Sequence, residues 1–460
     1  MILKTTAEQV LHEALKTGGD FAEIFCEDRH SGAMGLVDGH VESASTVRSH
    51  GAGIRVYDGL NSVYVHTNDT SPSGLIAAAR KAADAVDGSA AVGDIHLTRS
   101  LAANIHPIQA MPMDVAGSRK AKLLRDMDLA AREVSSEISQ VRANLTYWDS
   151  DVLIANSEGM FTGDRRVYTR MFCSAVAEGS GESQSGSAAP GAMMGFELFE
   201  GRVDVAEQAR RAARQAVTML HADPCPAGVM PVVIDGGFGG VIFHEACGHS
   251  LEATSVAFGN SVFAGKLGQR IASPIVTAVD DGTLAGEWGS LNIDDEGNPT
   301  TRLVLIQDGV LMNYMIDRLN GRRMKMPVTG SGRRQDYTFA PTSRMRNTFI
   351  APGSDDEAEI ISSCGDGLYA KDMGGGSVNP ATGEFNFAVK EGYLIKNGRI
   401  DRPVRGATLI GKGSEVLWKI DRVGGNMWMA QGMCGSSSGS IPTNVGQPMI
   451  RVTDMTVGGR

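Results

Sequence analysis

The feature that most constrains the fold of this chain is a change in residue pattern near its midpoint. The segment 221–228 reads HADPCPAG and places Pro224 and Pro226 two residues apart. Proline interrupts both helices and central strands, so such a segment is typical of a boundary. The 460 residues also exceed what one ordinary hydrophobic core accommodates. We therefore expect two domains, residues 1–224 and residues 225–460.

The first half alternates between helical and strand-like patterns. Apolar residues recur with helical spacing in four segments, at 5–16, 71–86, 115–134 and 203–220. Short strand candidates lie between them, at 21–27, 39–48, 53–58, 62–67, 140–148, 152–156 and 165–175. The stretch GSGESQSGSAAPGAM at 179–193 has the composition of a mobile loop. These patterns predict a mixed α/β N-terminal domain.

The second half is dominated by strand candidates that glycines interrupt. Glycine is abundant, with 57 among 460 residues, against an ordinary share of about 7%. Asp308-Gly309 and Asn397-Gly398 each separate two apolar runs, which is a hairpin signal. One segment, 240–253, has helical character. The fold class expected is α+β, with a β-rich, barrel-like or sandwich-like C-terminal domain that holds a single helix.

Charge and cysteine usage exclude several classes of protein. The 43 basic and 53 acidic side chains give a net charge of −10, without a basic tract, so we expect no nucleic-acid partner. The N-terminal 20 residues contain no signal-peptide core and no membrane-spanning run. The six cysteines form no CxxC pair. We expect a cytoplasmic protein without a membrane partner or a disulfide framework.

The helical segment contains the motif His244-Glu245-Ala-Cys-Gly248-His249, which is HExxH extended by one residue. Residues i and i+5 lie ~140° apart on a regular α-helix, so the two imidazoles would diverge. A single wide turn of π type would return them to one face, and such turns occur mostly at functional sites. Gly248 would lower the cost of that distortion. The motif therefore predicts a local irregularity.

Zinc binding by His244 and His249 is the interpretation that we favour. Glu245 would then lie beside the ion without being a ligand, where a general base for a zinc-activated water is needed. The alternatives are histidines that line a core, a cysteine hydrolase using Cys247 with His249, and a dinucleotide-binding turn. The last is disfavoured because GGFGG lacks the spacing GxGxxG.

A catalytic zinc ion normally has a third protein ligand. No histidine follows His249, so a thiolate or a carboxylate is required. Cys434, in a loop-like stretch of glycine and serine, is preferred over Cys364 and Cys247. Glu252 is the carboxylate alternative, and its other role would be to hold an imidazole N–H. The residues alone leave this choice open.

Several stretches together resemble the TldD/PmbA family of zinc-dependent peptidases, on its TldD side. They are the motif through Glu252, the stretches 51–59 and 64–69, the stretch 344–348 followed by Pro352-Gly353, Cys434-Gly435, and Gly446-Gln447-Pro448. The resemblance implies zinc bound by His244, His249 and Cys434. It also implies action on unfolded or flexible peptides within a dimer, either a homodimer or a heterodimer with a PmbA/TldE-like subunit that lacks the motif. Ala253-Thr254 and Ser436 depart from the family pattern.

The hypothesis is therefore a zinc metallopeptidase with Glu245 as general base and Zn²⁺ as its one cofactor. The alternative is a noncatalytic partner or scaffold subunit with a structural metal. Tyr337 and the pair Arg333-Arg334 are candidates for stabilising the oxyanion. Extended substrates could bind by strand addition at an exposed sheet edge.

Overall fold

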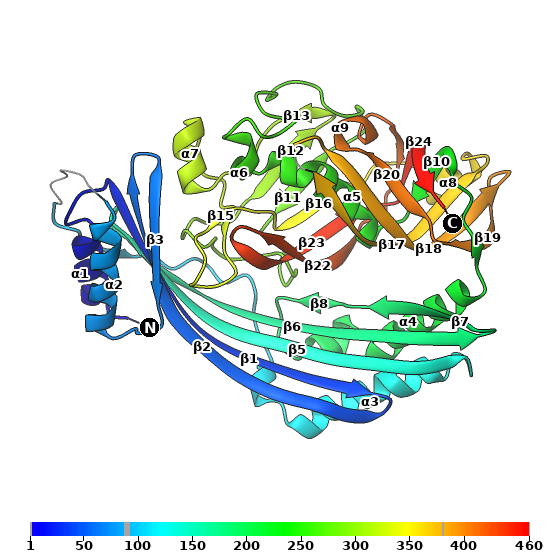
Figure 1. The fold of residues 1–460 in the computed structure, drawn as a ribbon, viewed down its shortest axis with the longest axis horizontal. Helices are drawn as coiled ribbons and strands as arrows, with labels where there is room; N and C mark the ends of the chain where they lie inside the picture. Colours follow the sequence, from blue (N-terminus) through cyan, green and yellow to red (C-terminus); the bar gives the residue numbers. More distant parts are fainter. Residues whose placement is uncertain (1, 87–92, 380, 460) are drawn as a thin grey trace.

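One long, curved β-sheet forms the N-terminal part of the molecule in the computed structural model, which describes residues 2–86, 93–379 and 381–459 (Figure 1). Its main strand order is β3-β2-β1-β5-β6-β4, and β7 and β8 also pair with β6. The strands are β1 (Phe21–Val37), β2 (His40–Asp58), β3 (Asn61–Thr67), β4 (Thr98–Arg99), β5 (Ile138–Asn156), β6 (Met160–Gly179), β7 (Glu182–Ala188) and β8 (Gly191–Ala192).

Four of these strands, β1, β2, β5 and β6, are longer than the sequence patterns predict. β1 and β2 stay paired from Phe21↔Tyr57 to Val37↔His40, where the sequence suggests separate short strands. The expected loop at 179–193 is also wrong in large part, because β7 pairs with β6 there. A β-carbon on Gly186 would lie 2.1 Å from the backbone oxygen of Ala212, so the glycine allows a helix to contact β7 directly.

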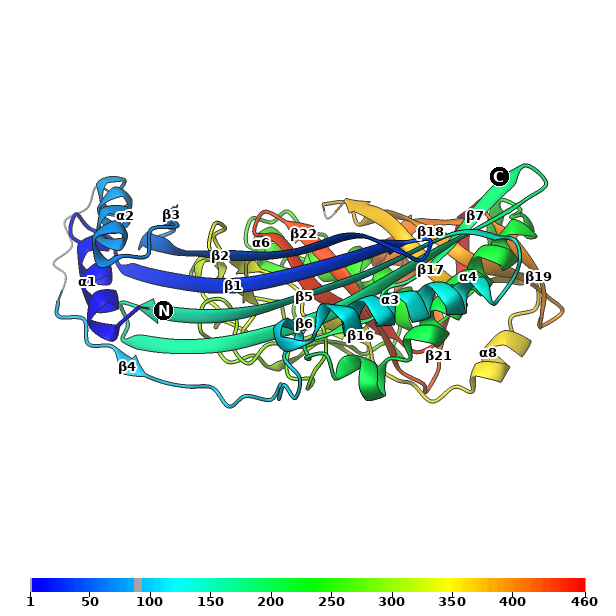
Figure 2. The ribbon, with the colours of Figure 1, turned by 90° about the horizontal axis from the view of Figure 1, so that it is seen from below.

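Four helices cover the two ends of this sheet (Figure 2). α1 (Lys4–Ala14) and α2 (Pro72–Asp84) pack on one end, and α3 (Gly117–Arg132) and α4 (Val205–Leu220) pack on the other. Each pair buries its apolar stripe in a cluster of its own with the strands beneath it. Two short helical turns, η1 (Pro112–Asp114) and η2 (Leu198–Arg202), complete this part. Each end of the N-terminal sheet therefore has a hydrophobic core of its own.

A closed five-stranded barrel is one of two large sheets in the C-terminal part. The strand order is β17-β10-β24-β20-β18, and a further pairing of β17 with β18 closes the ring. The barrel strands are β17 (Gly367–Asn379), β10 (Gly228–Ile234), β24 (Ile450–Gly458), β20 (Thr408–Lys412) and β18 (Glu384–Lys396), with β19 (Arg399–Arg405), β9 (Asp223–Pro224) and β21 (Ile420–Val423) attached. The barrel confirms the β-rich expectation, although β10 and β17 are parallel.

The second large sheet has the order β13-β12-β11-β16-β23-β22, so β22 forms an edge. Its strands are β11 (Ala278–Asp281), β12 (Arg302–Gln307), β13 (Val310–Leu311), β16 (Asn347–Ile350), β22 (Trp428–Ser436) and β23 (Gly439–Gln447). Smaller elements nearby are β14 (Gly332–Arg333), β15 (Thr342–Ser343), α6 (Ala253–Val256), α7 (Arg318–Met324), α8 (Glu357–Ser362) and α9 (Gly413–Val416). The expectation of a single helix in this half is therefore wrong, because helices as short as α7 and α8 give no helical periodicity in the sequence.

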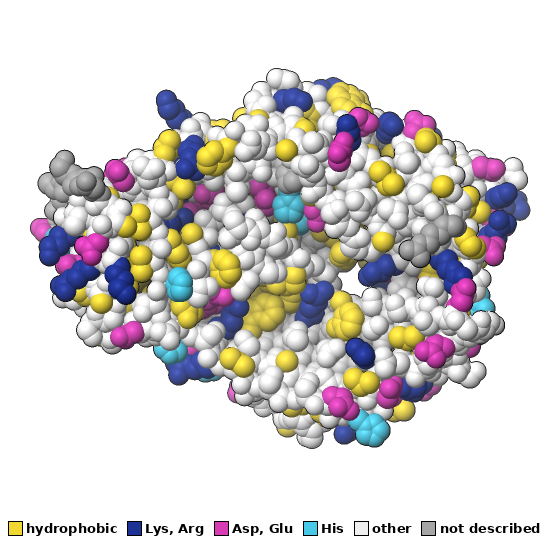
Figure 3. Space-filling model, viewed as in Figure 1, with side chains coloured by type: hydrophobic (Ala, Val, Ile, Leu, Met, Phe, Trp, Pro, Cys, Tyr) yellow, Lys and Arg dark blue, Asp and Glu magenta, His cyan; other side chains and the backbone are white. Residues whose placement is uncertain are grey.

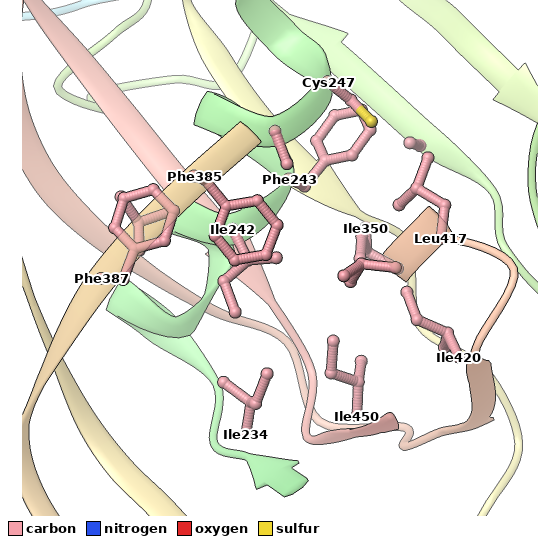
Figure 4. Packing of buried hydrophobic residues seen from close by; sticks show 14 of the residues in the cluster. Ile234, Ile242, Phe243, Cys247, Ile350, Phe385, Phe387, Leu417, Ile420 and Ile450 are labelled. Atoms are coloured by element: carbon pink, nitrogen blue, oxygen red, sulfur yellow. The ribbon is translucent and has the colours of Figure 1, made fainter. Parts of the chain in front are cut away.

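The predicted helical segment lies inside the C-terminal part and is irregular. It consists of η3 (Gly237–Gly240), α5 (Val241–Phe243), η4 (His244–Gly248) and η5 (His249–Leu251). One face of it contributes Ile242, Phe243 and Cys247 to a large apolar cluster with Phe385 and Ile450 (Figure 4). Burial of this face fixes the orientation of the segment.

Buried ion pairs join the long sheet to the C-terminal part. Arg55 on β2 bonds to Glu23 on β1 at 2.8 Å and to Glu296 at 2.7 Å. Arg334 bonds to Glu23 from the C-terminal side at 2.7 Å. Elsewhere the two parts separate around a hollow (Figure 3). None of the helices in the described ranges is long and apolar enough to cross a membrane.

Candidate metal centre

A π turn separates the two motif histidines, as the spacing predicts. η4 is a π-helical turn, and the backbone N–H of His249 donates to the carbonyl oxygen of His244, five residues earlier. The wider turn brings the two imidazoles onto one side of the helix. Their ring centroids lie 5.1 Å apart, with the planes nearly perpendicular.

Close packing, rather than backbone freedom, explains the glycine in this turn. Gly248 has φ −52° and ψ −54°, which any residue adopts. A β-carbon there would lie 2.2 Å from Sδ of Met345. On α9, a β-carbon at Gly413 would lie 1.9 Å from the carbonyl oxygen of Ala246. The expectation that Gly248 eases a backbone distortion is therefore wrong. Gly248 instead leaves room for the side chain of Met345.

Cys434 completes a group of three potential ligands. One atom each of His244, His249 and Cys434 lie within 4.8 Å of one another, and Sγ of Cys434 is 3.4 Å from Nε2 of His249. Cys434 is in β22, opposite Ile441, so the expectation of a loop around the ion is wrong. The edge strand β22 therefore places the thiol of Cys434 next to His249.

The other candidate thiols lie elsewhere. Cys247 is buried in the large apolar cluster (Figure 4). Cys364 belongs to a separate cluster with Val233 and Ile360. The His249 imidazole bonds instead to Glu252, so the interpretation of Cys247 with His249 as a hydrolase pair has no geometric support.

Each histidine is held through its Nδ1 atom. Oγ1 of Thr348, on β16, lies 3.1 Å from Nδ1 of His244. Oε2 of Glu252 lies 3.0 Å from Nδ1 of His249. Such contacts orient a ring and leave its Nε2 for a metal ion. Glu252 therefore has the alternative role that the sequence suggested, and Thr348 was missed because β16 is distant in sequence.

The electrostatics of the three side chains suit a cation. Burial alone would raise the pKa of the Cys434 thiol, but His244 and His249 lower that pKa to about 3. Burial opposes protonation of His249, yet Glu252 and Cys434 raise its pKa well above the usual value. A thiolate and two imidazoles are a normal zinc donor set, and three protein ligands leave a position open. The residues present fit a zinc ion.

Glu245 lies beside the ligand atoms without joining them. Its Oε2 is 3.6 Å from Nε2 of His249, and its side chain is 24% exposed. In the described part of the chain, that ion pair is its one polar contact. A carboxylate in this position is free to accept a proton from water.

The residues named for oxyanion stabilisation have other partners. Arg333 donates to the carbonyl oxygens of Met345 and Pro442. Arg334 pairs with Glu23 in the junction between the two parts. Tyr337 stacks edge-on against His66. Among the described residues, none of the three hydrogen-bonds to the histidines or to Cys434.

Comparison with known proteins assigns this chain to a family. Models of the PmbA/TldA metallopeptidase domain 1, central domain and C-terminal domain match residues 22–86, 112–220 and 227–459. The chain belongs to the PmbA/TldD metallopeptidase family. It is a metallopeptidase, as the sequence hypothesis expects.

Curated relatives match this chain over different lengths, and a solved structure shares its fold. The metalloprotease TldD homolog of Haemophilus influenzae is 36% identical over 456 residues, covering 96% of this chain and 93% of the relative. A zinc metalloprotease TldD homolog of Saccharolobus solfataricus is 28% identical and covers 57% of this chain and 58% of the relative. The TldE structure from Thermococcus kodakarensis superposes with a TM-score of 0.76 at 18% identity, covering 99% of this chain and 100% of TldE.

Proposed function

We propose that this protein is a zinc-dependent peptidase that hydrolyses peptide bonds in unfolded or flexible peptides. His244, His249 and Cys434 would bind Zn²⁺, and Glu245 would act as general base. The observation that supports this proposal most directly is the π turn, which places both imidazoles against the thiol. A structural metal in a noncatalytic scaffold subunit is the alternative.

The chain's own residues would divide the work of hydrolysis. When bound, zinc supplies a Lewis acid that acidifies water and polarises the peptide carbonyl. Glu245 accepts a proton from the attacking water as the oxygen bonds to the carbonyl carbon. Glu245 then returns the proton to the amine as the C–N bond breaks. Thr348 and Glu252 keep the two rings oriented throughout.

The position of Cys434 supports a preference for extended substrates. β22 is the edge strand of its sheet and pairs with β23 alone. An extended peptide can add to such an edge through backbone hydrogen bonds, which are insensitive to side-chain identity. The carbonyl oxygens of Gln431, Gly432 and Cys434 already accept hydrogen bonds from side chains, so the peptide would pair with other backbone groups of β22. A hollow between the long sheet and the C-terminal sheets gives room for a chain (Figure 3). An unfolded or flexible segment can adopt the extended conformation that this edge requires.

We further propose a cytoplasmic location and assembly as a dimer, with a second copy or with a PmbA/TldE-like subunit. The likeness to TldE supports pairing with a PmbA/TldE-like subunit, because it shows that TldE and this chain share one fold. Light scattering of the chain alone, and after coexpression with such a subunit, distinguishes the two assemblies. A monomer under both conditions would reject the proposal.

Substitution of Glu245 by Gln tests the catalytic assignment. Glu245→Gln should retain one zinc ion per chain and lose peptide cleavage by a factor of about 10² or more, because the proton acceptor is absent. Cys434→Ser is the contrasting variant and should lose zinc as well as cleavage. The measurements are metal content and hydrolysis of an unstructured peptide. Undiminished cleavage by Glu245→Gln would refute the general base.

A further inference from the structure

The segment 344–348, which reads Arg-Met-Arg-Asn-Thr, contacts every ligand-bearing element of the candidate metal site. Thr348 bonds to His244. The backbone N–H of Met345 donates to Glu252, the residue that holds His249, at 3.3 Å. Arg344 bonds to the backbone of Cys434. The segment 344–348 therefore contacts His244 directly, His249 through Glu252, and Cys434 through its backbone.

Arg344 occupies the central position in this arrangement. It is fully buried, and its Nη2 donates to the carbonyl oxygen of Cys434 at 2.5 Å. Its Nη1 donates to Oγ of Ser438 and to the carbonyl oxygen of Gly439, each at 2.9 Å. These acceptors lie at the turn of the β22–β23 hairpin.

The remaining nitrogen of Arg344 faces the helix side of the site. Its Nε is buried and has no hydrogen-bond partner among the described residues, and it lies 3.8 Å from Oε1 of Glu252. Glu252 is itself only 3% exposed, so the nearby guanidinium charge offsets the cost of burying the carboxylate. Arg344 thus adjoins both the hairpin of Cys434 and the carboxylate that orients His249.

We propose that Arg344 is a positioning residue that sets the distance between the Cys434 thiolate and the His249 imidazole. The two ligands belong to separate elements, 185 residues apart in sequence. A planar guanidinium with fixed donor directions can hold a carbonyl, a turn and a carboxylate together. A lysine in its place has a single point of charge and cannot reproduce this geometry. The inference builds on the proposed zinc function.

Arg346 provides a matched control in the same segment. It is equally buried, and its Nε bonds to Asp280 at 2.7 Å. Its other donors bond to the backbone oxygens of Gly330 and Asp280. It makes no hydrogen bond to Cys434 or Glu252 in the described chain. An effect that comes only from replacing a buried arginine should therefore appear in variants of both Arg344 and Arg346.

The experiment compares Arg344→Lys with Arg346→Lys in the full-length protein. Zinc affinity is measured by competition with a chelator, and the thiolate–metal bond by the charge-transfer absorption of the Co²⁺-substituted protein. Arg344→Lys should weaken zinc binding about 10- to 100-fold and reduce the cobalt–thiolate band. Arg346→Lys should lower the unfolding temperature and leave both metal readouts near wild type.

Each outcome bears on the proposal. The positioning role of Arg344 would be overturned if Arg344→Lys bound zinc as tightly as the wild-type protein. It would also be overturned if Arg346→Lys lost as much zinc affinity as Arg344→Lys. Neither result would contradict the zinc function. A wild-type protein that binds no zinc would instead reject the zinc function and this inference with it. If Arg344→Lys does not fold, Ser438→Ala removes one acceptor of Nη1 and should give a smaller loss in the same direction. An unchanged affinity in Ser438→Ala would then overturn the proposal.

Discussion

Cys434 differs from the other five cysteines of the chain in its electrostatic surroundings. All six thiols are buried and free. Burial raises the pKa of Cys26 and Cys173 to about 12, and it raises the pKa of Cys225, Cys247 and Cys364 as well. For Cys434 the two histidines outweigh burial and lower the pKa to about 3. Burial alone therefore does not decide the charge of a thiol.

Alkylation of the zinc-free protein should consequently be selective for Cys434. The thiolate is the reactive form, so the other cysteines should react slowly at neutral pH. The rate at Cys434 should stay nearly constant between about pH 8 and pH 5, whereas an ordinary thiol slows about tenfold per pH unit below its pKa. Iodoacetamide labelling followed by peptide mass analysis measures this. Zinc should protect Cys434, and preferential labelling of Cys247 would contradict the assignment.

At the scale of elements, the π turn is enclosed on two sides by contacts that only glycine permits. Met345 approaches Gly248 from one side, and α9 approaches Ala246 through Gly413 from the other. The two contacts differ in kind, because Met345 presents a flexible side chain and Ala246 presents backbone. The packing of neighbouring elements therefore helps to hold this turn in its wide form.

Alanine substitutions at these two glycines should lower the folding stability by different amounts. Gly248→Ala should cost about 1–3 kcal/mol of folding free energy, the usual range for overpacking. Gly413→Ala should cost more and weaken zinc binding, because backbone must move away from the added β-carbon. The control is Gly117→Ala at the start of α3, which should be neutral or stabilising. Apart from its chain neighbours and the adjacent helix backbone, no heavy atom of the described residues lies within 4 Å of a β-carbon there. Chemical denaturation of the three variants gives the ranking, and equal costs at Gly248 and Gly413 would contradict it.

At the scale of the whole molecule, a buried charge network joins the N-terminal sheet to the C-terminal part. Glu23 has two cationic partners, Arg55 and Arg334, which outweigh burial and lower its pKa. Burial raises the pKa of Glu296 to about 8, because Arg55 only partly offsets it and Asp317 is nearby. Arg166 bonds to Asp295 in the same region. The division into domains 1–224 and 225–460 remains a prediction across this junction.

The raised pKa of Glu296 predicts a pH dependence of stability. Between its ordinary pKa of 4.5 and the raised pKa of about 8, Glu296 keeps a proton in the folded state that it has released in the unfolded state. The folded state then binds more protons, so this contribution to stability falls as pH rises through that window. As the pH rises from about 5.5 to about 8.5, the unfolding temperature of the wild-type protein should fall relative to that of Glu296→Gln. Parallel pH profiles in thermal denaturation would contradict this.

The local sequence determined those features that depend on near neighbours. Asp308-Gly309 and Asn397-Gly398 predict hairpins, and both turns have the expected positive φ angles. The five-residue spacing of His244 and His249 requires a wide turn, and the structure has one. A β-rich second half follows from strand patterns and glycine in the same way, because each of these signals depends on backbone conformation within a few residues.

Long-range contacts decided the rest. No local pattern indicates that β1 and β2 continue as single long strands, because pairing with neighbouring strands stabilises them. Nor does a local pattern indicate that β7 replaces a loop, because β7 is stabilised by pairing with β6 and by packing against α4. Residue chemistry left Cys434, Cys364, Cys247 and Glu252 open as third ligands. Only the folded chain brings the edge strand β22 against the π turn and places Thr348 and Arg344 behind it. The low pKa of Cys434 depends on its buried position and on the nearby histidines. These surroundings form only once the separate segments have packed together.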